Sequence, residues 1–382
     1  MTGGPVVAAR RPPLVSQFVS DLVYGDAVSN DCLNLDRLLR GFGYRTRLFV
    51  QRVGDQYRSR TQRFDAYAPE TGEVALLHYS VWSDLAQFAR DQVRAPLVLV
   101  YHNVTPPEYF AGLHPQAEQD TRLGRDSLPT FRERAALALG KSGFSAAELK
   151  AAGFSRTGVL PVAVDLAALH RRADERVRRR YADGYVNVLS VGRVVPNKRP
   201  EDTIKLFYHY HRSVNPRSRL LFVGPKLIAG DYLFWLERLV ERLGLDPHVE
   251  FVGQVSRAEL ATYYRLAHAY VSMSEHEGFG VPLVEALSFG LPVLARAAAA
   301  VPETLDGAGV LVRRACYAAL AELLDLLVRP GPLRAALAAR GRARARAFSL
   351  PAVGRQLAAY LAALGYPPPG LVPGGAREHR QG

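Results

Sequence analysis

Short apolar runs alternate along the chain with segments in which apolar residues recur at helical spacing. Continuous Val- and Leu-rich runs are typical of strands that are covered on both faces, as in a parallel sheet. The runs in the first half of the chain are Leu14–Val19, Thr46–Val50, Val74–Tyr79, Leu97–Tyr101 and Val159–Val164. Those in the second half are Val186–Val191, Leu220–Val223, Val249–Val252, Ala269–Met273, Val293–Ala295 and Gly309–Val312.

Amphipathic segments lie between these runs. One of them places apolar side chains along a single helix face, at Cys32, Leu35, Leu38, Leu39 and Phe42. Strands that alternate with helices predict doubly wound α/β domains. At 382 residues the chain is too long for one ordinary core. We therefore expect two Rossmann-like domains of roughly 150–200 residues each.

A polar, arginine-rich segment from Arg171 to Arg180 marks the boundary between the two domains. A charge run of this kind is usually a solvated linker or helix face. We predict an N-terminal domain over residues 14–180 and a C-terminal domain over residues 185–348. The segment 350–364 predicts one more helix that packs back towards the N-terminal domain. Residues 366–382 are dominated by Pro, Gly and charged residues, a composition typical of a disordered tail.

The formal net charge is +13, and the excess is almost entirely arginine. Such an excess attracts anionic partners, for example a membrane surface, a phosphorylated acceptor or nucleic acid. A GC-rich genome explains the arginine and alanine content equally well, so charge alone decides nothing. The only lysines are Lys141, Lys150, Lys198, Lys205 and Lys226.

No apolar run reaches the roughly 20 residues that a membrane span needs. No apolar stretch follows Arg10 and Arg11 to make a secretory signal. The two cysteines, Cys32 and Cys316, cannot form a disulfide framework or a zinc site. We expect a cytoplasmic protein, with association at the inner face of the cell membrane as a further option.

The strongest chemical signal is the segment 274–285, which follows the apolar run ending at Met273 and opens a helix. Pro282 suits the first helical position, and Gly290 suits the helix end. Gly278 and Gly280 let a ligand approach the backbone closely, and the free N–H groups of a helix start favour phosphate.

Two carboxylates stand eight positions apart in this segment, and we expect Glu277 in the loop and Glu285 in the first turn of the helix. A carboxylate offers paired acceptors for vicinal hydroxyls on a sugar or a ribose. A structural alternative is that Glu285 complements the helix dipole and Glu277 is a solvated loop residue.

Two cations follow the apolar run Val186–Val191, at the same sheet edge as the segment 274–285. Arg193 and Lys198 flank a turn there, and together they suit a diphosphate leaving group. The alternative is that both are ordinary surface cations.

These motifs resemble those of glycosyltransferase family 4, which are retaining enzymes of the GT-B fold. The Gly-Arg-(four residues)-Lys turn and the Glu-(seven residues)-Glu loop carry the resemblance, from about Val186 to Val312. The linker signature Leu160-Pro161-Val162-Ala163 is also similar, although Ala163 stands where a glycine is frequent. The resemblance implies two Rossmann-like domains that face each other across a central cleft.

The resemblance also implies roles for the motif residues. Glu277 would contact the donor sugar, Glu285 the ribose, and Arg193 with Lys198 the diphosphate. It implies further donor contacts by Gly25, Asp26, Asn30, Gly278, Phe279, Gly280 and Val281. The family needs neither a cofactor nor a metal, and the chain has no Asp-x-Asp beside a nucleotide-binding strand.

In the first domain, Ser29 or Asn30 suits a helix cap. His102, after the run Leu97–Tyr101, resembles the family's cleft histidine, which binds the reacting sugar or acceptor. His78 also ends a run, and we expect it in the core or behind the site. His276, inside the donor loop, could be solvated.

The acceptor side has weaker signals. The segment Gln51–Arg63 carries Arg52, Arg58, Arg60 and Arg63, which suit either an anionic lipid surface or a solvated loop. Three aromatic side chains are candidates for an acceptor groove or for the core: Tyr109, Phe110 and Phe131.

The sequence therefore predicts a hexosyltransferase that uses a UDP- or GDP-sugar and a glycan, glycolipid or small-glycoside acceptor. Polysaccharide synthesis for the cell envelope is the expected process. Two alternatives stay open. A sugar-nucleotide epimerase of the same architecture would need an acid/base set that the sequence does not display. A non-enzymatic basic protein that binds an anionic polymer or membrane would leave the paired glutamates without a purpose, and we expect no nucleic-acid partner.

Overall fold

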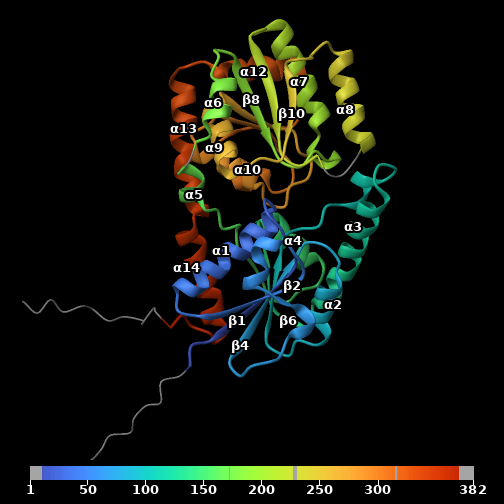
Figure 1. Ribbon diagram of the computed structural model, residues 1–382, viewed down its shortest axis with the longest axis vertical. Helices are drawn as coiled ribbons and strands as arrows, with labels where there is room; N and C mark the ends of the chain where they lie inside the picture. The colour runs from blue at the N-terminus through green and yellow to red at the C-terminus, as the bar shows by residue number, and fades with distance from the viewer. Residues whose placement is uncertain (1–10, 172, 227–229, 315, 370–382) are drawn as a thin grey trace, which may run out of the picture.

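The computed structural model describes residues 11–171, 173–226, 230–314 and 316–369. They form two α/β domains stacked along the long axis of the molecule (Figure 1). Each domain is built on one parallel sheet, which confirms the predicted fold class. The part of the expected tail beyond residue 369 lies outside the described residues.

The N-terminal sheet has seven strands in the order β3-β2-β1-β4-β5-β6-β7. Its strands are β1 (Leu14–Leu22), β2 (Arg45–Val53), β3 (Gln62–Arg63), β4 (Glu73–Tyr79), β5 (Leu97–Tyr101), β6 (Ala135–Gly140) and β7 (Thr157–Val159). The α-helices between them are α1 (Ala27–Gly41), α2 (Asp84–Asp91), α3 (Pro115–Ser127) and α4 (Gly143–Ala151). Apolar side chains from alternate strand positions fill separate cores on the two faces of this sheet.

The C-terminal sheet has six strands in the order β10-β9-β8-β11-β12-β13. Its strands are β8 (Val186–Val191), β9 (Ser218–Val223), β10 (Val249–Gly253), β11 (Ala269–Ser272), β12 (Val293–Arg296) and β13 (Val310–Val312). The helices of this half are α5 (Leu166–His170), α6 (Glu175–Tyr181), α7 (Pro200–Ser213), α8 (Gly230–Arg242), α9 (Arg257–Leu266), α10 (Val281–Ser288), α11 (Val301–Leu305), α12 (Tyr317–Val328) and α13 (Pro332–Ala345).

The chain crosses between the domains twice, and the two crossings pair with each other. The backbone N–H of Val164 donates to the carbonyl of Phe348 at 2.9 Å, and Val164 forms an isolated bridge with Ser349. The second crossing leads into α14 (Leu350–Ala363), which packs against α1 of the N-terminal domain (Figure 1). Its apolar face supplies Leu350, Val353, Leu357 and Leu361 to the N-terminal core.

Three features differ from the sequence prediction. The run Val159–Val164 is mostly linker, because Pro161 has no N–H to donate to a strand ladder. Strand β6 was missed, because its alanine-rich sequence lacks the β-branched residues that mark the other strands. Helices α5 and α6 pack on α9, so residues 166–181 lie with the C-terminal domain rather than with the expected unit 14–180.

Candidate active site

The carboxyl ends of the two sheets meet at the junction between the domains. The hydroxyl of Ser142, after β6, donates to the carbonyl of Gly278, after β11, at 2.8 Å. The amide of Gln254, after β10, donates to the carbonyl of Tyr24, after β1, at 3.3 Å. The junction is thus the strand edge at which open α/β sheets bind ligands.

The loop that contains Gly278 and Gly280 positions the start of α10 at this junction. Gly280 is the N-cap of α10 with a φ of 90°, a backbone conformation that favours glycine. The helix begins at Val281, so Pro282 takes the second helical position rather than the predicted first. The hydroxyl of Thr304 donates to the carbonyl of Phe279 at 2.6 Å and holds the loop. No side chain of the described residues caps this helix, so its first N–H groups are available to an anion.

Glu277 and Lys198 form an ion pair that joins two loops of the C-terminal sheet. The Nζ atom of Lys198 lies 2.6 Å from Oε1 of Glu277, and both side chains are mostly buried. Asn197 fixes the same two loops, since its amide donates to the carbonyl of His276 at 3.0 Å. The predicted sugar-binding carboxylate and the predicted diphosphate-binding cation therefore form one unit.

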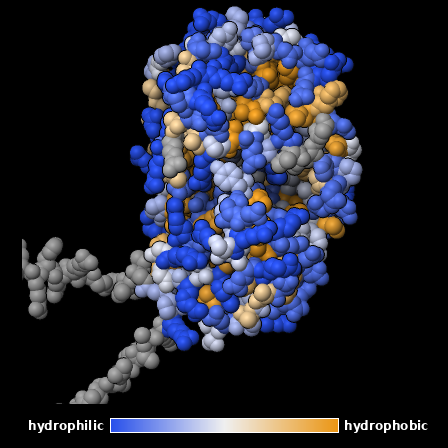
Figure 2. All heavy atoms as spheres, viewed as in Figure 1, coloured by the Kyte–Doolittle hydropathy of each residue, from blue (hydrophilic) through white to orange (hydrophobic). Residues whose placement is uncertain are grey.

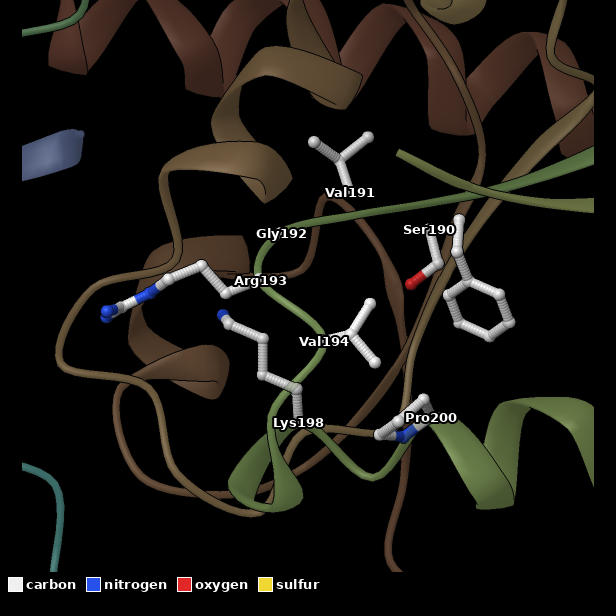
Figure 3. Close-up of a pocket in the computed structure, with 8 residues that line it drawn as sticks. Ser190, Val191, Gly192, Arg193, Val194, Lys198 and Pro200 are labelled. Atoms are coloured by element: carbon white, nitrogen blue, oxygen red, sulfur yellow. The ribbon is translucent and has the colours of Figure 1, made fainter. Parts of the chain in front are cut away.

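Arg193 lies beside this pair and is exposed. Within the described part of the chain it makes no hydrogen bond or ion pair. A small hollow opens here, lined by Arg193, Lys198, Gly192 and the end of β8. Figure 3 shows the side chains of Arg193 and Lys198 on the same side of the turn. Two cations at one hollow create a strongly anion-attracting position.

Glu285 lies in the second turn of α10, not in the first as expected. The hydroxyl of Tyr264, on α9, donates to its carboxylate at 2.8 Å. Burial raises the pKa of Glu285 to about 7, against a smaller lowering by the Tyr264 hydrogen bond. A carboxylate with this pKa exchanges its charge near neutral pH, as functional carboxylates often do.

The loop between β1 and α1 approaches the C-terminal domain at Gly25, which has a φ of 79°. A Cβ at Gly25 would lie 3.0 Å from the side-chain nitrogen of Gln254. Asp26 is the N-cap of α1, because its carboxylate accepts from the backbone N–H of Ser29 at 2.9 Å. This corrects the expected cap at Ser29 or Asn30. The side chain of Asn30 is half-buried and makes no hydrogen bond to other described residues.

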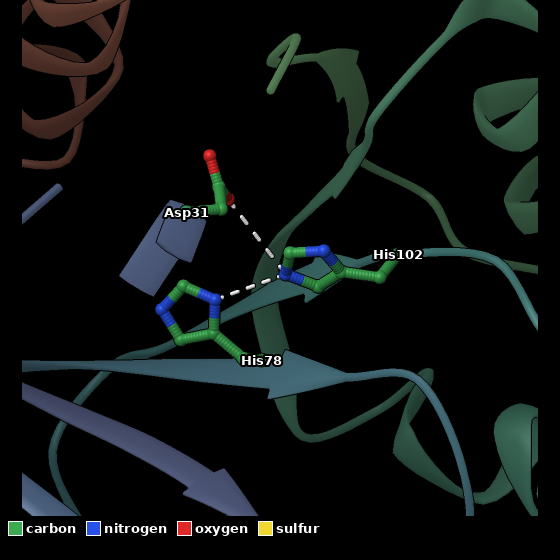
Figure 4. Close-up of side chains that lie close together, drawn as sticks. All are labelled: Asp31, His78 and His102. Carbon is green, nitrogen blue, oxygen red and sulfur yellow. Dashed lines mark hydrogen bonds and ion pairs between the residues drawn. The ribbon is translucent and has the colours of Figure 1, made fainter. Parts of the chain in front are cut away.

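His102 follows β5, and its side chain is 5% exposed. Its Nε2 lies 3.0 Å from Nδ1 of His78 and 3.8 Å from Oδ2 of Asp31 (Figure 4). Nε2 of His78 lies 2.9 Å from the amide oxygen of Gln17. That oxygen can only accept, so His78 donates there and accepts the N–H of His102. Burial is the main cause that lowers the pKa of His102 well below its ordinary value, followed by the charge of Lys141.

The sequence comparison decides the family. Residues 172–344 match the family model described as glycosyl transferases group 1. Residues 172–344 therefore belong to the group 1 glycosyltransferase family.

Individual relatives agree with this family. The chain is 34% identical over 178 residues to a D-inositol 3-phosphate glycosyltransferase of Frankia alni, covering 44% of this chain and 43% of that protein. It is 28% identical over 304 residues to the Mycobacterium bovis protein of the same name, covering 74% and 58% of the two chains. It is 27% identical over 161 residues to the O-antigen chain mannosyltransferase B of Escherichia coli, covering 42% of each. The matches thus span about half the length of these curated relatives.

Solved structures share the fold over nearly the whole chain. Anabaena HepE, solved in complex with UDP and glucose, aligns with a TM-score of 0.74 at 19% identity, covering 92% of this chain and all of that one. A sucrose-phosphate synthase of Thermosynechococcus elongatus aligns with a TM-score of 0.71 at 20% identity, covering 92% and 99% of the two chains. The chain therefore has the GT-B fold.

The sequence alone did not reveal a buried ion pair behind His102. Nζ of Lys141 lies 2.5 Å from Oδ2 of Asp31, and neither side chain is more than 1% exposed. Lys141 directly follows β6, the strand that the apolar pattern missed. It is one of only five lysines, and its place at the end of a strand was the available signal.

Asp31, His78 and His102 also bring a carboxylate and two imidazoles together, ligand types that bind transition metals. The ammonium group of Lys141 already neutralises the carboxylate oxygen that faces His102. We therefore assign no metal to this cluster.

The arginines of segment 51–63 are paired with carboxylates, so the segment has less unpaired positive charge than its sequence suggests. Each of its four arginines lies within 4 Å of a carboxylate in the pairs Arg52–Asp21, Arg58–Asp55, Arg60–Asp36 and Arg63–Asp65. Figure 2 shows a mainly hydrophilic face on which hydrophobic residues form small groups and no continuous patch. Among the described residues, no helix is long and apolar enough to cross a membrane.

The three aromatic candidates for an acceptor groove divide into two kinds. Phe110 and Phe131 are buried at 6% and 0% exposure, so they belong to the core. Tyr109 is half-buried, and its ring centroid lies 6.3 Å from that of His276 across the domain junction. His276 itself is 7% exposed, so it is not the solvated loop residue we considered.

Proposed function

We propose that the protein is a retaining, metal-independent hexosyltransferase that uses a UDP- or GDP-sugar as donor. The observation that carries the proposal is the unit formed by Lys198, Glu277 and Arg193 beside the hollow at the end of β8. Group 1 family membership supports this reading over an epimerase or a non-enzymatic binding protein.

The proposed chemistry follows from charge. The bond between the sugar C1 and the diphosphate oxygen breaks while the acceptor hydroxyl oxygen attacks C1 from the same face. Negative charge then grows on the diphosphate, and Arg193 and Lys198 stabilise it. These fixed charges of the protein take the place of a metal ion. The departing phosphate takes the acceptor proton. Glu277 holds hydroxyls of the sugar, Glu285 those of the ribose, and His102 contacts the reacting sugar or the acceptor.

The acceptor is a polysaccharide, glycolipid or small glycoside, and synthesis for the cell envelope is the proposed process. The O-antigen chain and D-inositol 3-phosphate named for the relatives support an acceptor of this range. The UDP and glucose bound to HepE support a nucleoside-diphosphate donor. Peripheral contact with an anionic membrane from the cytoplasmic side remains part of the proposal.

A metal-free thermal-shift screen against UDP, GDP, ADP, their common sugars and NAD tests this function. A ligand that binds only the native state raises the melting temperature by mass action. A response to one diphosphate family would identify the base and support transfer. No response to any nucleotide, together with stabilisation by polyanions, would contradict the proposal in favour of a binding protein.

A further inference from the structure

The buried Lys141–Asp31 pair is the most unusual electrostatic feature of the N-terminal domain. Lys141 is 1% exposed, and Asp31 on α1 is completely buried. Removing two charges from water costs more than their attraction usually returns, and well-packed apolar residues at such sites are often at least as stable. Stability alone therefore gives little reason for this pair.

The pair lies directly behind His102. Oδ2 of Asp31 is shared between Lys141, at 2.5 Å, and Nε2 of His102, at 3.8 Å. Oδ1 of Asp31 accepts the backbone N–H of Ala163, in the linker between the domains, at 2.9 Å. Asp31 thus has a fixed orientation and cannot turn away from the imidazole.

The charges around His102 come from several elements. Asp31 and Cys32 lie on α1, His78 ends β4, and Lys141 follows β6. Burial raises the pKa of the Cys32 thiol well above its usual value, so the thiol stays neutral. Burial and the charge of Lys141 lower the pKa of His78 to about 3. The carboxylate of Asp31 is therefore the one negative charge next to the His102 ring among the described residues, and Lys141 compensates it.

The hydrogen bonds select one tautomer of His102. Because its Nε2–H donates to His78, its Nδ1 carries a free lone pair. Figure 4 shows Nε2 directed towards Asp31 and His78, with the second ring nitrogen directed away from both. No hydrogen bond to Nδ1 is formed by the described residues.

We propose that Lys141 is a positioning residue that compensates the buried charge of Asp31 and so keeps His102 neutral, in the tautomer that its bond to His78 selects, so that its Nδ1 accepts a hydroxyl hydrogen from a bound sugar. The proposal rests on the proposed transfer function and deepens it. Without Lys141, the uncompensated carboxylate would stabilise the imidazolium, which has no acceptor nitrogen. Without the charge of Asp31, the ammonium group of Lys141 would disfavour the His102 imidazolium more strongly than it does in the parent protein.

Two variants with opposite charge effects test the pair. Lys141→Met keeps the apolar stem and removes the cation, whereas Asp31→Asn keeps an acceptor for Ala163 and removes the anion. The readout is UDP release from UDP-glucose, or GDP release from GDP-mannose, as a function of pH. Lys141→Met should lose about tenfold in rate between pH 8 and pH 6, because a raised His102 pKa protonates the ring in that range. Asp31→Asn should lose no more rate between pH 8 and pH 6 than the parent protein does.

The double variant Asp31→Asn/Lys141→Met restores neutrality and should recover the parent pH profile. The melting temperatures of the two single variants show whether each of them folds. A loss of rate between pH 8 and pH 6 that is equal in all three variants, or no such loss in Lys141→Met, would overturn the proposal.

Nitrogen-15 NMR of the imidazole rings gives a readout that needs no donor. The parent should show His102 as a neutral Nε2–H tautomer at pH 6, and Lys141→Met should show an imidazolium at that pH. A neutral His102 in Lys141→Met would contradict the pairing even if transfer is established. A parent protein that binds no nucleotide but shows these ring states would overturn the transfer function and leave the charge pairing intact.

Discussion

Nζ of Lys198 lies 2.6 Å from Oε1 of Glu277, although the two residues are 79 positions apart and follow different strands. Each group is the other's charge partner in this structure. A donor would give Lys198 its diphosphate and Glu277 its sugar hydroxyls. The ion pair thus holds both side chains near their proposed positions and reduces the ordering that binding requires.

Lys198→Ala should weaken donor binding and slow turnover, since it removes one fixed charge from the leaving group. Loss of one such group typically costs about 10²–10³ in rate. Glu277→Ala should abolish transfer, and neither change should unfold the protein. Steady-state kinetics and melting temperatures check both variants. Lys205→Ala on α7, a half-buried lysine outside the hollow, is the matched control. Transfer at the parent rate by Lys198→Ala would contradict the leaving-group role.

Glu285 should make the unfolding free energy depend on pH. Its pKa in the folded protein is raised to about 7 from an ordinary 4.5, so the folded state binds the proton more tightly than the unfolded chain. Stability from this group is therefore complete below pH 4.5 and is lost as pH rises to about 7. The loss is at most about 3 kcal/mol.

Glu285→Gln keeps the shape of the side chain and removes this titration. Urea unfolding of both proteins at pH 5 and pH 7.5 measures the difference. The variant should gain stability relative to the parent at pH 7.5 and not at pH 5. An equal difference at both values would mean that Glu285 does not titrate in this range.

Tyr264→Phe should separate donor affinity from turnover. The lost hydroxyl donates to Glu285 at 2.8 Å. We expect the donor KM to rise about three- to tenfold, with kcat nearly unchanged, because a hydrogen bond to a charged group contributes about 1 kcal/mol or more. The pKa of Glu285 should also rise further, since this bond lowers it. Tyr263→Phe, also on α9 but packed against Tyr181, is the control. Equal effects of both changes would indicate a packing role only.

The sequence could place the proposed donor-side residues at one sheet edge because their pattern is local. Glu277 and Glu285 share one strand–helix unit, and Arg193 with Lys198 shares one turn, so strand position alone brings all four to one sheet edge. The two doubly wound α/β domains also followed from the alternation of apolar runs and amphipathic segments, whereas the GT-B fold followed from the resemblance of the motifs.

Other features depend on contacts between distant segments, which no local pattern encodes. Asp31 meets Lys141 only because α1 packs beside the end of β6. Tyr264 meets Glu285 only because α9 and α10 share a core. The cap at Asp26 was missed because Asp, Ser and Asn all suit an N-cap, and backbone geometry selects among them.

Gly278→Ala should keep the two domains from closing to the distance seen here. A Cβ at Gly278 would lie 2.5 Å from Cβ of Asn103 and 2.8 Å from the carbonyl oxygen of His102, across the domain junction. These distances are too short for real atoms, so the loops must separate. The clash would also weaken the hydrogen bond from Ser142 to the carbonyl of Gly278.

We expect this variant to fold with a melting temperature close to the parent value, because each domain has its own core. Small-angle X-ray scattering should show a larger radius of gyration, and kcat should fall at least about tenfold, since a small displacement of reacting groups is costly. Gly41→Ala is the control, because a Cβ there meets nothing within 4 Å. Parent-like scattering and turnover in Gly278→Ala would show that the contact between Gly278 and His102 is not required for transfer.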